Sequence, residues 1–240
     1  MDHKQSIKEV IRHVLFRTGL SQSLVSARQR RGYKVSHLEK STASERFSAI
    51  YELGIWRHSE EQDSSSGLGS TISATANVVA ELPPLLSSLN CKRLLDVGCG
   101  DWNWMRNADL PCEYIGIDIV PAVIEANRKY EREGVHFAVT DSIQGPLPQA
   151  DVALCREILF HLSFKDAAAV LANIKSASSW LLATTDTSIW FNSDIETGDY
   201  RKINLERPPY RFPAPQKVIR DEAVSNGRVL GLWRTSDLRR

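Results

Sequence analysis

The stretch RLLDVGCGDWNWM, residues 93–105, decides the fold class of this chain. A short, mostly apolar run ends in two glycines, Gly98 and Gly100, with one residue between them. Glycines at such a point let the chain turn sharply and let a ligand approach the backbone without a Cβ in the way. Asn103 stands where a dinucleotide fingerprint has its third glycine, and the two tryptophans leave little room for a pyrophosphate. The stretch therefore predicts a strand whose end binds a ligand without phosphates.

Strand-like and helical runs alternate after this stretch. The expected strands are 93–98, 114–120, 136–141, 151–156 and 179–186. The expected helices are 121–133 and 164–177, and residues 102–105 look like a further helix start. Two last strands, 216–223 and 228–235, flank turn residues and predict an antiparallel pair. We therefore expect an α/β, Rossmann-like sheet of seven strands, mostly parallel with an antiparallel last strand, and helices on both faces.

The part of the chain before this stretch predicts a helical extension. Residues 4–17 place apolar side chains at helical spacing opposite basic ones, and residues 45–56 and 71–89 also read as helices. A polar, glycine-containing loop lies between the last two. A second long loop, rich in proline and polar residues, follows the fifth strand, and a loop of that length is usually functional. We divide the chain into an extension with a lid, 1–66, and a domain, 67–240, that carries a substrate loop at 188–216.

Composition bounds the partners and the compartment. The 240 residues include 30 Lys and Arg against 29 Asp and Glu, so no charge excess favours nucleic acid as the main partner. The four cysteines form no CxxC pair, and we expect reduced thiols in a cytoplasmic protein with no metal site. The basic segment 4–34 leaves two interpretations open, a solvated helix on the domain's own surface and a peripheral contact with a membrane or a protein. The sequence does not fix the oligomeric state.

Acidic residues end the next two predicted strands. Asp118 ends the second, followed by Ile119, and a carboxylate there can accept hydrogen bonds from both hydroxyls of a ribose. Asp141 and Ser142 end the third, where a carboxylate can accept from an adenine amino group. Because the carboxyl ends of parallel strands share one edge of the sheet, these residues predict an adenosine held without phosphate.

In these motifs the chain resembles class I S-adenosylmethionine-dependent methyltransferases, whose signature is an acidic residue followed by GxG at the end of the first strand. The resemblance runs from about residue 92 to 182 and extends to the antiparallel last strand. It departs at Trp102, where many members have a third glycine. It implies S-adenosylmethionine as cofactor, S-adenosylhomocysteine as product, and no metal. The cofactor residues it implies are Asp96, Gly98, Gly100, Asp118, Asp141 and Ser142. Ile119, next to Asp118, and Arg156 are further candidates for the cofactor site. Ser70, at a helix start, either closes over the methionine carboxylate or belongs to a flexible linker.

The residues after the fourth strand carry the acceptor chemistry in this superfamily. His161 is our candidate general base, because its imidazole titrates near neutral pH; the alternative is a ring satisfied by a backbone group. Arg156 either pairs with Glu157 or touches the carboxylate of the methyl donor. The loop 188–216 supplies rings that stack on sugar faces and polar groups that bind hydroxyls. These candidate acceptor contacts are Trp190, Asn192, Tyr200, Arg201 and Tyr210.

The sequence thus predicts methyl transfer to a small-molecule or carbohydrate acceptor, with oxygen as the preferred atom. The chain is similar to a group of small bacterial methyltransferases associated with cell-surface or secondary-metabolite carbohydrates, and it lacks the Asn/Asp-Pro-Pro-Tyr/Phe tetrad of enzymes that methylate planar amines. N-methylation of an amino sugar or another amine is the nearest alternative, with His161 only positioning the acceptor. A non-catalytic partner protein with the same fold is the other.

Overall fold

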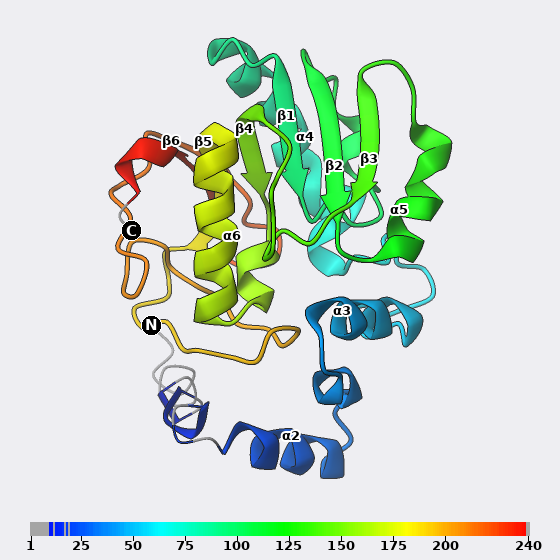
Figure 1. The fold of residues 1–240 in the computed structure, drawn as a ribbon, viewed down its shortest axis with the longest axis vertical. Coiled ribbons are helices and arrows are strands. Elements are labelled where there is room, and N and C mark those ends of the chain that lie inside the picture. The colour runs from blue at the N-terminus through cyan, green and yellow to red at the C-terminus, as the bar shows by residue number, and fades with distance from the viewer. Residues whose placement is uncertain (1–9, 12, 17, 19, 239–240) are drawn as a thin grey trace.

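A computed structural model describes residues 10–238 of the chain, apart from 12, 17 and 19. Within these residues a seven-stranded sheet has the order β3-β2-β1-β4-β5-β7-β6 (Figure 1). Its strands are β1 Arg93–Val97, β2 Glu113–Asp118, β3 Val135–Val139, β4 Ala150–Cys155, β5 Ser178–Asp186, β6 Lys217–Arg220 and β7 Arg228–Arg234. β7 is antiparallel to β5 and β6, and the pairs among β1 to β5 are parallel. The predicted sheet is confirmed.

The strand order reverses at β1, which pairs with β2 on one side and β4 on the other. In open α/β sheets the crevice at such a point, outside the carboxyl ends of the strands, is where ligands bind. The end of β1, with its two glycines, is therefore placed where the fold offers a site.

Helices cover both faces of the sheet, which explains why its central strands are apolar on both sides. α4 (Ile72–Ser88) and α5 (Pro121–Asn127) pack on one face, and α6 (Phe164–Ala177) lies on the other, in front of the sheet in Figure 1. Threonine and serine side chains cap the first turns of α4 and α6. α5 is shorter than the predicted helix 121–133 and continues as a 3-10 turn, Arg128–Tyr130.

The predicted helix start at 102–105 is wrong. Only a 3-10 turn, Met105–Asn107, follows β1, and Trp102 adopts a left-handed φ of 54°. Trp102, Trp104 and Met105 are all buried, so the segment has no polar face to turn toward solvent. The Trp102 ring packs edge-on against Phe137, 5.2 Å between centroids. Bulky side chains thus cover the sheet where a crossover helix was expected.

The extension lies beyond the carboxyl ends of the central strands. Figure 1 shows α2 (Ser21–Arg30) and α3 (Ala43–Glu52) past the arrowheads of β1 to β4. α3 begins with a capping box between Thr42 and Glu45, whereas α2 was not predicted. Of the predicted helix 4–17, residues 10, 11 and 13–16 are helical and the others lie outside the described residues. None of the described helices combines the length and apolarity that crossing a bilayer requires.

The two loops predicted from the sequence are present. Residues 57–71 contain only a 3-10 turn, Leu68–Ser70, before α4 begins. Residues 187–216 contain neither helix nor strand. The connection between β6 and β7 spans residues 221–227, which is longer than the tight turn expected at 224–227. Both long loops lie toward the carboxyl edge, so they can shape whatever binds there.

Candidate functional site

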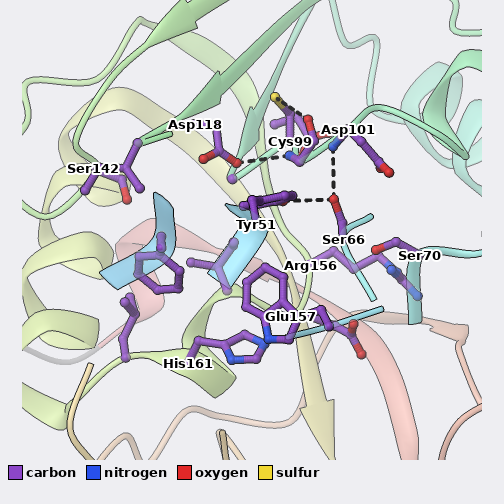
Figure 2. Close-up of a pocket in the computed structure, with 18 of the residues that line it drawn as sticks. Tyr51, Ser66, Ser70, Cys99, Asp101, Asp118, Ser142, Arg156, Glu157 and His161 are labelled. Atoms are coloured by element: carbon purple, nitrogen blue, oxygen red, sulfur yellow. Dashed lines mark hydrogen bonds between the residues drawn. The ribbon is translucent and has the colours of Figure 1, made fainter. Parts of the chain in front are cut away.

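A pocket with an empty volume of about 950 Å³, part of it open to solvent, lies at the carboxyl edge of the sheet (Figure 2). It is lined by every residue that the sequence assigned to the cofactor, and by His161. Other lining residues come from the extension and from the loop 57–71. None of the five predicted acceptor contacts in the loop 188–216 lines it.

The end of β1 forms one wall. Gly98 and Gly100 have φ angles of +72° and +55°, which glycine adopts at little cost. The Gly100 N–H donates to Oδ2 of Asp118 at 3.1 Å, and the Val120 N–H donates to Oδ1 at 3.0 Å. Because a carboxylate offers about four acceptor positions, Asp118 retains capacity for two ligand hydroxyls.

Asp96 lies deeper, below the glycines. It is 4% exposed and accepts a hydrogen bond of 2.7 Å from the Tyr114 hydroxyl. Burial raises the pKa of Asp96 to about 7, although the Tyr114 hydrogen bond opposes the rise. A positive charge placed next to this carboxyl would favour its ionised form.

The loop after β3 forms the neighbouring wall. Asp141 Oδ1 accepts from the Ile143 N–H at 2.9 Å, which closes a tight turn, and the Ser142 carbonyl accepts from Asn173 at 2.9 Å. Figure 2 shows Asp118 and Ser142 on the same side of the pocket. The residues predicted for the ribose and adenine are therefore neighbours in space as well as in order.

Residues 64–70, where the extension meets the domain, are fastened across the end of β1; we call this segment the strap. The Asp101 carboxylate accepts from the Ser64 hydroxyl at 3.0 Å and from the Ser65 N–H at 2.6 Å. The Ser66 hydroxyl accepts from the Asp101 N–H at 3.0 Å and bonds the Tyr51 hydroxyl at 2.9 Å. The sequence analysis missed Asp101 and Tyr51. The available signal was the serine run 64–66 together with the acidic residue after the GxG motif, because serine hydroxyls need an acceptor and a carboxylate supplies one.

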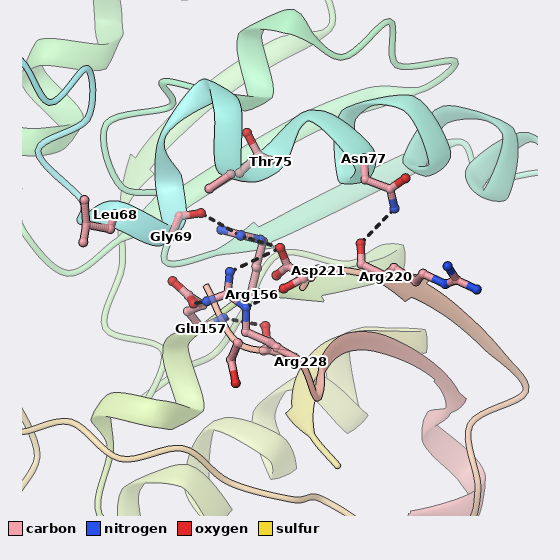
Figure 3. A network of polar contacts seen from close by, with 12 residues as sticks. Leu68, Gly69, Thr75, Asn77, Arg156, Glu157, Arg220, Asp221 and Arg228 are labelled. Carbon is pink, nitrogen blue, oxygen red and sulfur yellow. Dashed lines mark hydrogen bonds and ion pairs between the residues drawn. The ribbon is translucent and has the colours of Figure 1, made fainter. Parts of the chain in front are cut away.

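A cluster of four charged side chains stands behind the pocket (Figure 3). Asp221 accepts from Arg156 at 2.9 Å and from Arg228 at 3.3 Å, and Arg228 also pairs with Glu157. Arg156 donates in addition to the Gly69 carbonyl at 2.7 Å, which ties the strap to the end of β4. The ion pair between Arg156 and Glu157 that the sequence suggested is thus not formed. Arg156 pairs instead with Asp221, the residue after β6, and Glu157 pairs with Arg228 of β7.

One polar atom of this cluster stays unused. Nε of Arg156 is buried and has no hydrogen-bond partner among the described residues, and Arg156 lines the pocket. Buried donors in proteins are nearly always hydrogen-bonded. Arg156 therefore brings a buried positive charge to the wall of the pocket.

His161 is drawn below Asp118, at the lower edge of the pocket, in Figure 2. Its Nδ1 is 3.0 Å from the Asp199 carbonyl, and because a carbonyl only accepts, Nδ1 carries the hydrogen and Nε2 keeps a lone pair. The ring packs between Trp56 and Tyr200, with centroids 4.9 and 5.4 Å away. Burial lowers the pKa of His161, and the Glu157 charge opposes this shift. The side chain is therefore neutral near pH 7 and can accept a proton.

Asn192, Arg201 and Tyr210, three of the five predicted acceptor residues in the loop 188–216, make contacts within the protein. Asn192 donates to the carbonyls of Asn204 and Pro208, at 2.9 and 2.8 Å. Arg201, 1% exposed, donates to the Leu159 carbonyl at 3.2 Å and to the Tyr210 hydroxyl at 3.2 Å. Trp190 is 52% exposed, and Tyr200 reaches the site only through its ring contact with His161. The aromatic walls of the pocket come instead from Phe47, Tyr51, Trp56 and Trp104.

Comparison with known proteins agrees with this geometry. Residues 95–178, from β1 to the start of β5, match the family model of a methyltransferase domain. The strand order and the antiparallel β7 agree with this match. Residues 95–178 are similar to a methyltransferase domain, and the sheet has the fold of class I methyltransferases. A search of curated proteins gives no match.

Two solved structures are similar to the methyltransferase domain and its surroundings. Human N-acetylserotonin methyltransferase, solved with S-adenosylmethionine, is 16% identical to this chain and has a TM-score of 0.54. The match covers 92% of this chain and 68% of the human chain. The mitomycin 7-O-methyltransferase MmcR is 16% identical with a TM-score of 0.51, covering 68% of this chain and 53% of its own. The chain thus spans about half the length of MmcR. At this identity the likeness shows a shared fold.

We predict that Asp221→Asn destabilises the methyltransferase domain strongly. The substitution removes the charge that two buried guanidinium groups share, and breaking a buried pair costs about 3–5 kcal/mol. Urea unfolding followed by circular dichroism measures the loss. The neighbouring Glu222 is exposed, so Glu222→Gln serves as the control and should leave the unfolding midpoint unchanged. Equal midpoints for the two variants would contradict the role of the cluster.

Proposed function

We propose that this chain transfers the methyl group of S-adenosylmethionine to a hydroxyl of a small-molecule acceptor, with His161 as the general base. The observation that carries the proposal is the contact between Nδ1 of His161 and the Asp199 carbonyl, in a residue that lines the same pocket as Asp118. Because Nδ1 donates to this carbonyl, Nε2 is the basic nitrogen. A neutral imidazole and a nucleoside-binding edge in one cavity are what an O-methyltransferase requires.

The lining residues fit the cofactor. Asp118 would bind the ribose hydroxyls, and the loop of Asp141 and Ser142 would hold the adenine. Arg156, which lines the pocket beside the strap, would attract the carboxylate of the methionine part through its positive charge. When bound, S-adenosylmethionine supplies a methyl group on a positively charged sulfur.

His161 does the proton chemistry. Its Nε2 takes the proton of the acceptor hydroxyl as the methyl group arrives, and the Asp199 carbonyl keeps the ring in the required tautomer. The negative charge of Glu157 favours the imidazolium that forms. Trp56 packs against the ring and restricts its rotation, so the base stays aimed while the acceptor binds.

Several features support a small-molecule acceptor, with carbohydrates included. Trp56 and Tyr51 at the pocket offer faces on which a ring can stack. Both solved neighbours are named for small molecules, mitomycin and N-acetylserotonin. The extension 1–66 acts in this proposal as the lid, since Phe47, Tyr51, Trp56 and Ser66 all line the pocket. The four free thiols fit a reducing compartment such as the cytoplasm.

The first test is cofactor binding. We expect the wild type to bind S-adenosylmethionine and S-adenosylhomocysteine in titration calorimetry, and Asp118→Ala to lose the binding because the ribose hydroxyls lose their acceptor. Asp109 is exposed and lies outside the pocket, so Asp109→Ala is the charge-matched control and should bind as the wild type does. Wild-type affinity in Asp118→Ala would refute the assigned ribose site. No binding to the wild type would favour a non-catalytic partner protein.

The second test follows from Asp96. Its pKa of about 7 means that part of the population is protonated in the free protein near neutral pH. A bound sulfonium favours the ionised form and lowers that pKa, so S-adenosylmethionine binding should release more protons than S-adenosylhomocysteine binding, which brings no sulfonium charge. Calorimetry in two buffers of different ionisation enthalpy measures the difference. Asp96→Asn should abolish it, and an equal proton release by both ligands would place the sulfur away from Asp96.

The third test is the base. Once an acceptor is found, His161→Ala should lower kcat by about 10²–10⁴-fold near pH 7. Because burial holds the pKa of His161 below its ordinary value, the wild-type rate should fall only when the pH drops below about 6.5. His136→Ala, at an exposed position on β3, is the control. A His161→Ala enzyme that recovers full activity at high pH would instead support N-methylation of an amine that arrives neutral.

A further inference from the structure

The carbonyl that fixes the tautomer of His161 belongs to a turn with no regular secondary structure. This turn, residues 196–199, lies in the middle of the long loop after β5. Its backbone contacts the 3-10 turn of His161 directly, since the Gly198 N–H donates to the His161 carbonyl at 2.8 Å. The orientation of the base therefore depends on where a loop segment is held.

Side chains from the extension bind the other side of this turn. Arg46, in α3, donates to the Thr197 carbonyl at 2.9 Å. His37 lies 3.0 Å from the Gly198 carbonyl through Nε2, which must donate because the carbonyl only accepts. Three successive carbonyls, 197 to 199, are thus each bound by a side chain from outside the turn, and His161 binds the third.

An ion pair completes the contact. Arg28, in the last turn of α2, pairs with the Asp199 carboxylate at 2.8 Å, on the residue whose carbonyl accepts from His161. The Asp199 side chain is 12% exposed and that of Arg28 32%, so the pair is partly shielded from solvent. Arg28 and His161 are over 130 positions apart in the sequence, and both contact Asp199.

We propose that Arg28, His37 and Arg46 are positioning residues, through which the amino-terminal extension aims His161 by holding the turn 196–199. The inference rests on the proposed role of His161 and adds a role for the basic segment before residue 47. The extension then has two tasks, because Phe47 and Tyr51 wall the pocket and the residues before them orient the base.

Nuclear magnetic resonance tests the inference without knowledge of the acceptor. Imidazole nitrogen shifts of ¹⁵N-histidine-labelled full-length protein report the tautomer, with His161→Gln assigning the signal. We expect the wild-type ring to be the Nδ1–H tautomer, and the double variant Arg28→Ala/Arg46→Ala to show an averaged mixture of both tautomers. Arg31→Ala removes a positive charge from an exposed position just after α2 and should keep the wild-type signal. An unchanged tautomer in the double variant would overturn the proposal.

The pH titration of the same signal separates positioning from mere structural support. The charged groups that face His161 are Glu157, Asp199 and Arg201. Arg28→Ala removes the positive charge that pairs with Asp199, so the pKa of His161 should rise relative to the wild type, whereas Arg28→Lys keeps the charge and should restore the wild-type midpoint. If the double variant does not fold, these single variants decide the question. Identical midpoints in Arg28→Ala and the wild type would count against the ion pair.

Activity supplies the last readout once an acceptor is known. Arg28→Ala/Arg46→Ala should lower kcat by about tenfold and leave the affinity for S-adenosylmethionine unchanged, because misplacing a base costs rate while the ribose site is untouched. An unchanged kcat would contradict the inference. If His161→Ala is fully active, the proposed function fails, yet the tautomer measurement still reports whether the extension holds the ring.

Discussion

The sharing of the Asp221 carboxylate by two buried arginines is the interaction on which the site depends. Arg156 comes from the end of β4 and Arg228 from the start of β7, so a single carboxylate joins the parallel part of the sheet to its antiparallel end. Arg156, Arg228 and Asp221 would each be costly to bury alone, and the hydrogen bonds among them offset that cost. Arg156 then extends the same network to the strap through the Gly69 carbonyl. One cluster of ion pairs thus connects the wall of the pocket to the sheet.

The sequence predicted which residues meet at the carboxyl edge of the sheet, because their positions are set by strand ends. Asp96, Asp118 and Asp141 occur at the ends of three successive strands, and the geometry of a parallel sheet brings such residues to one edge whatever the loops do. The alternation of strand-like and helical runs also predicted the parallel part of the sheet. The failure at 102–105 has a local cause. Apolar periodicity cannot distinguish a helix from a segment that buries nearly all its side chains, as Trp102 and Trp104 do.

The acceptor half could not be predicted in the same way. Whether Arg201 binds a hydroxyl or the backbone depends on contacts across a loop without periodicity, and the structure gives it carbonyls and the Tyr210 hydroxyl. Tyr51 and Trp56 were overlooked because an aromatic residue in a short helix is usually a core residue. Their place in the pocket follows from where α3 docks, and α3 is hydrogen-bonded to Ser66 of the strap and to the turn 196–199. Such long-range partners leave no local signal.

The antiparallel placement of β7 between β5 and β6 has a consequence for the order of folding. The strap and α3 are synthesised before the sheet that they cover. Arg156, which donates to the strap, pairs with Asp221, and this cluster is complete only when Arg228 has joined it. Contacts between residues so far apart in sequence form late, because loop closure must precede them. Until β7 inserts, the strap has Asp101 to bind, but the cluster around Arg156 lacks Arg228. The tie between the strap and the end of β4 therefore gains its full set of partners only with the antiparallel end of the sheet, although the strap leaves the ribosome before any strand.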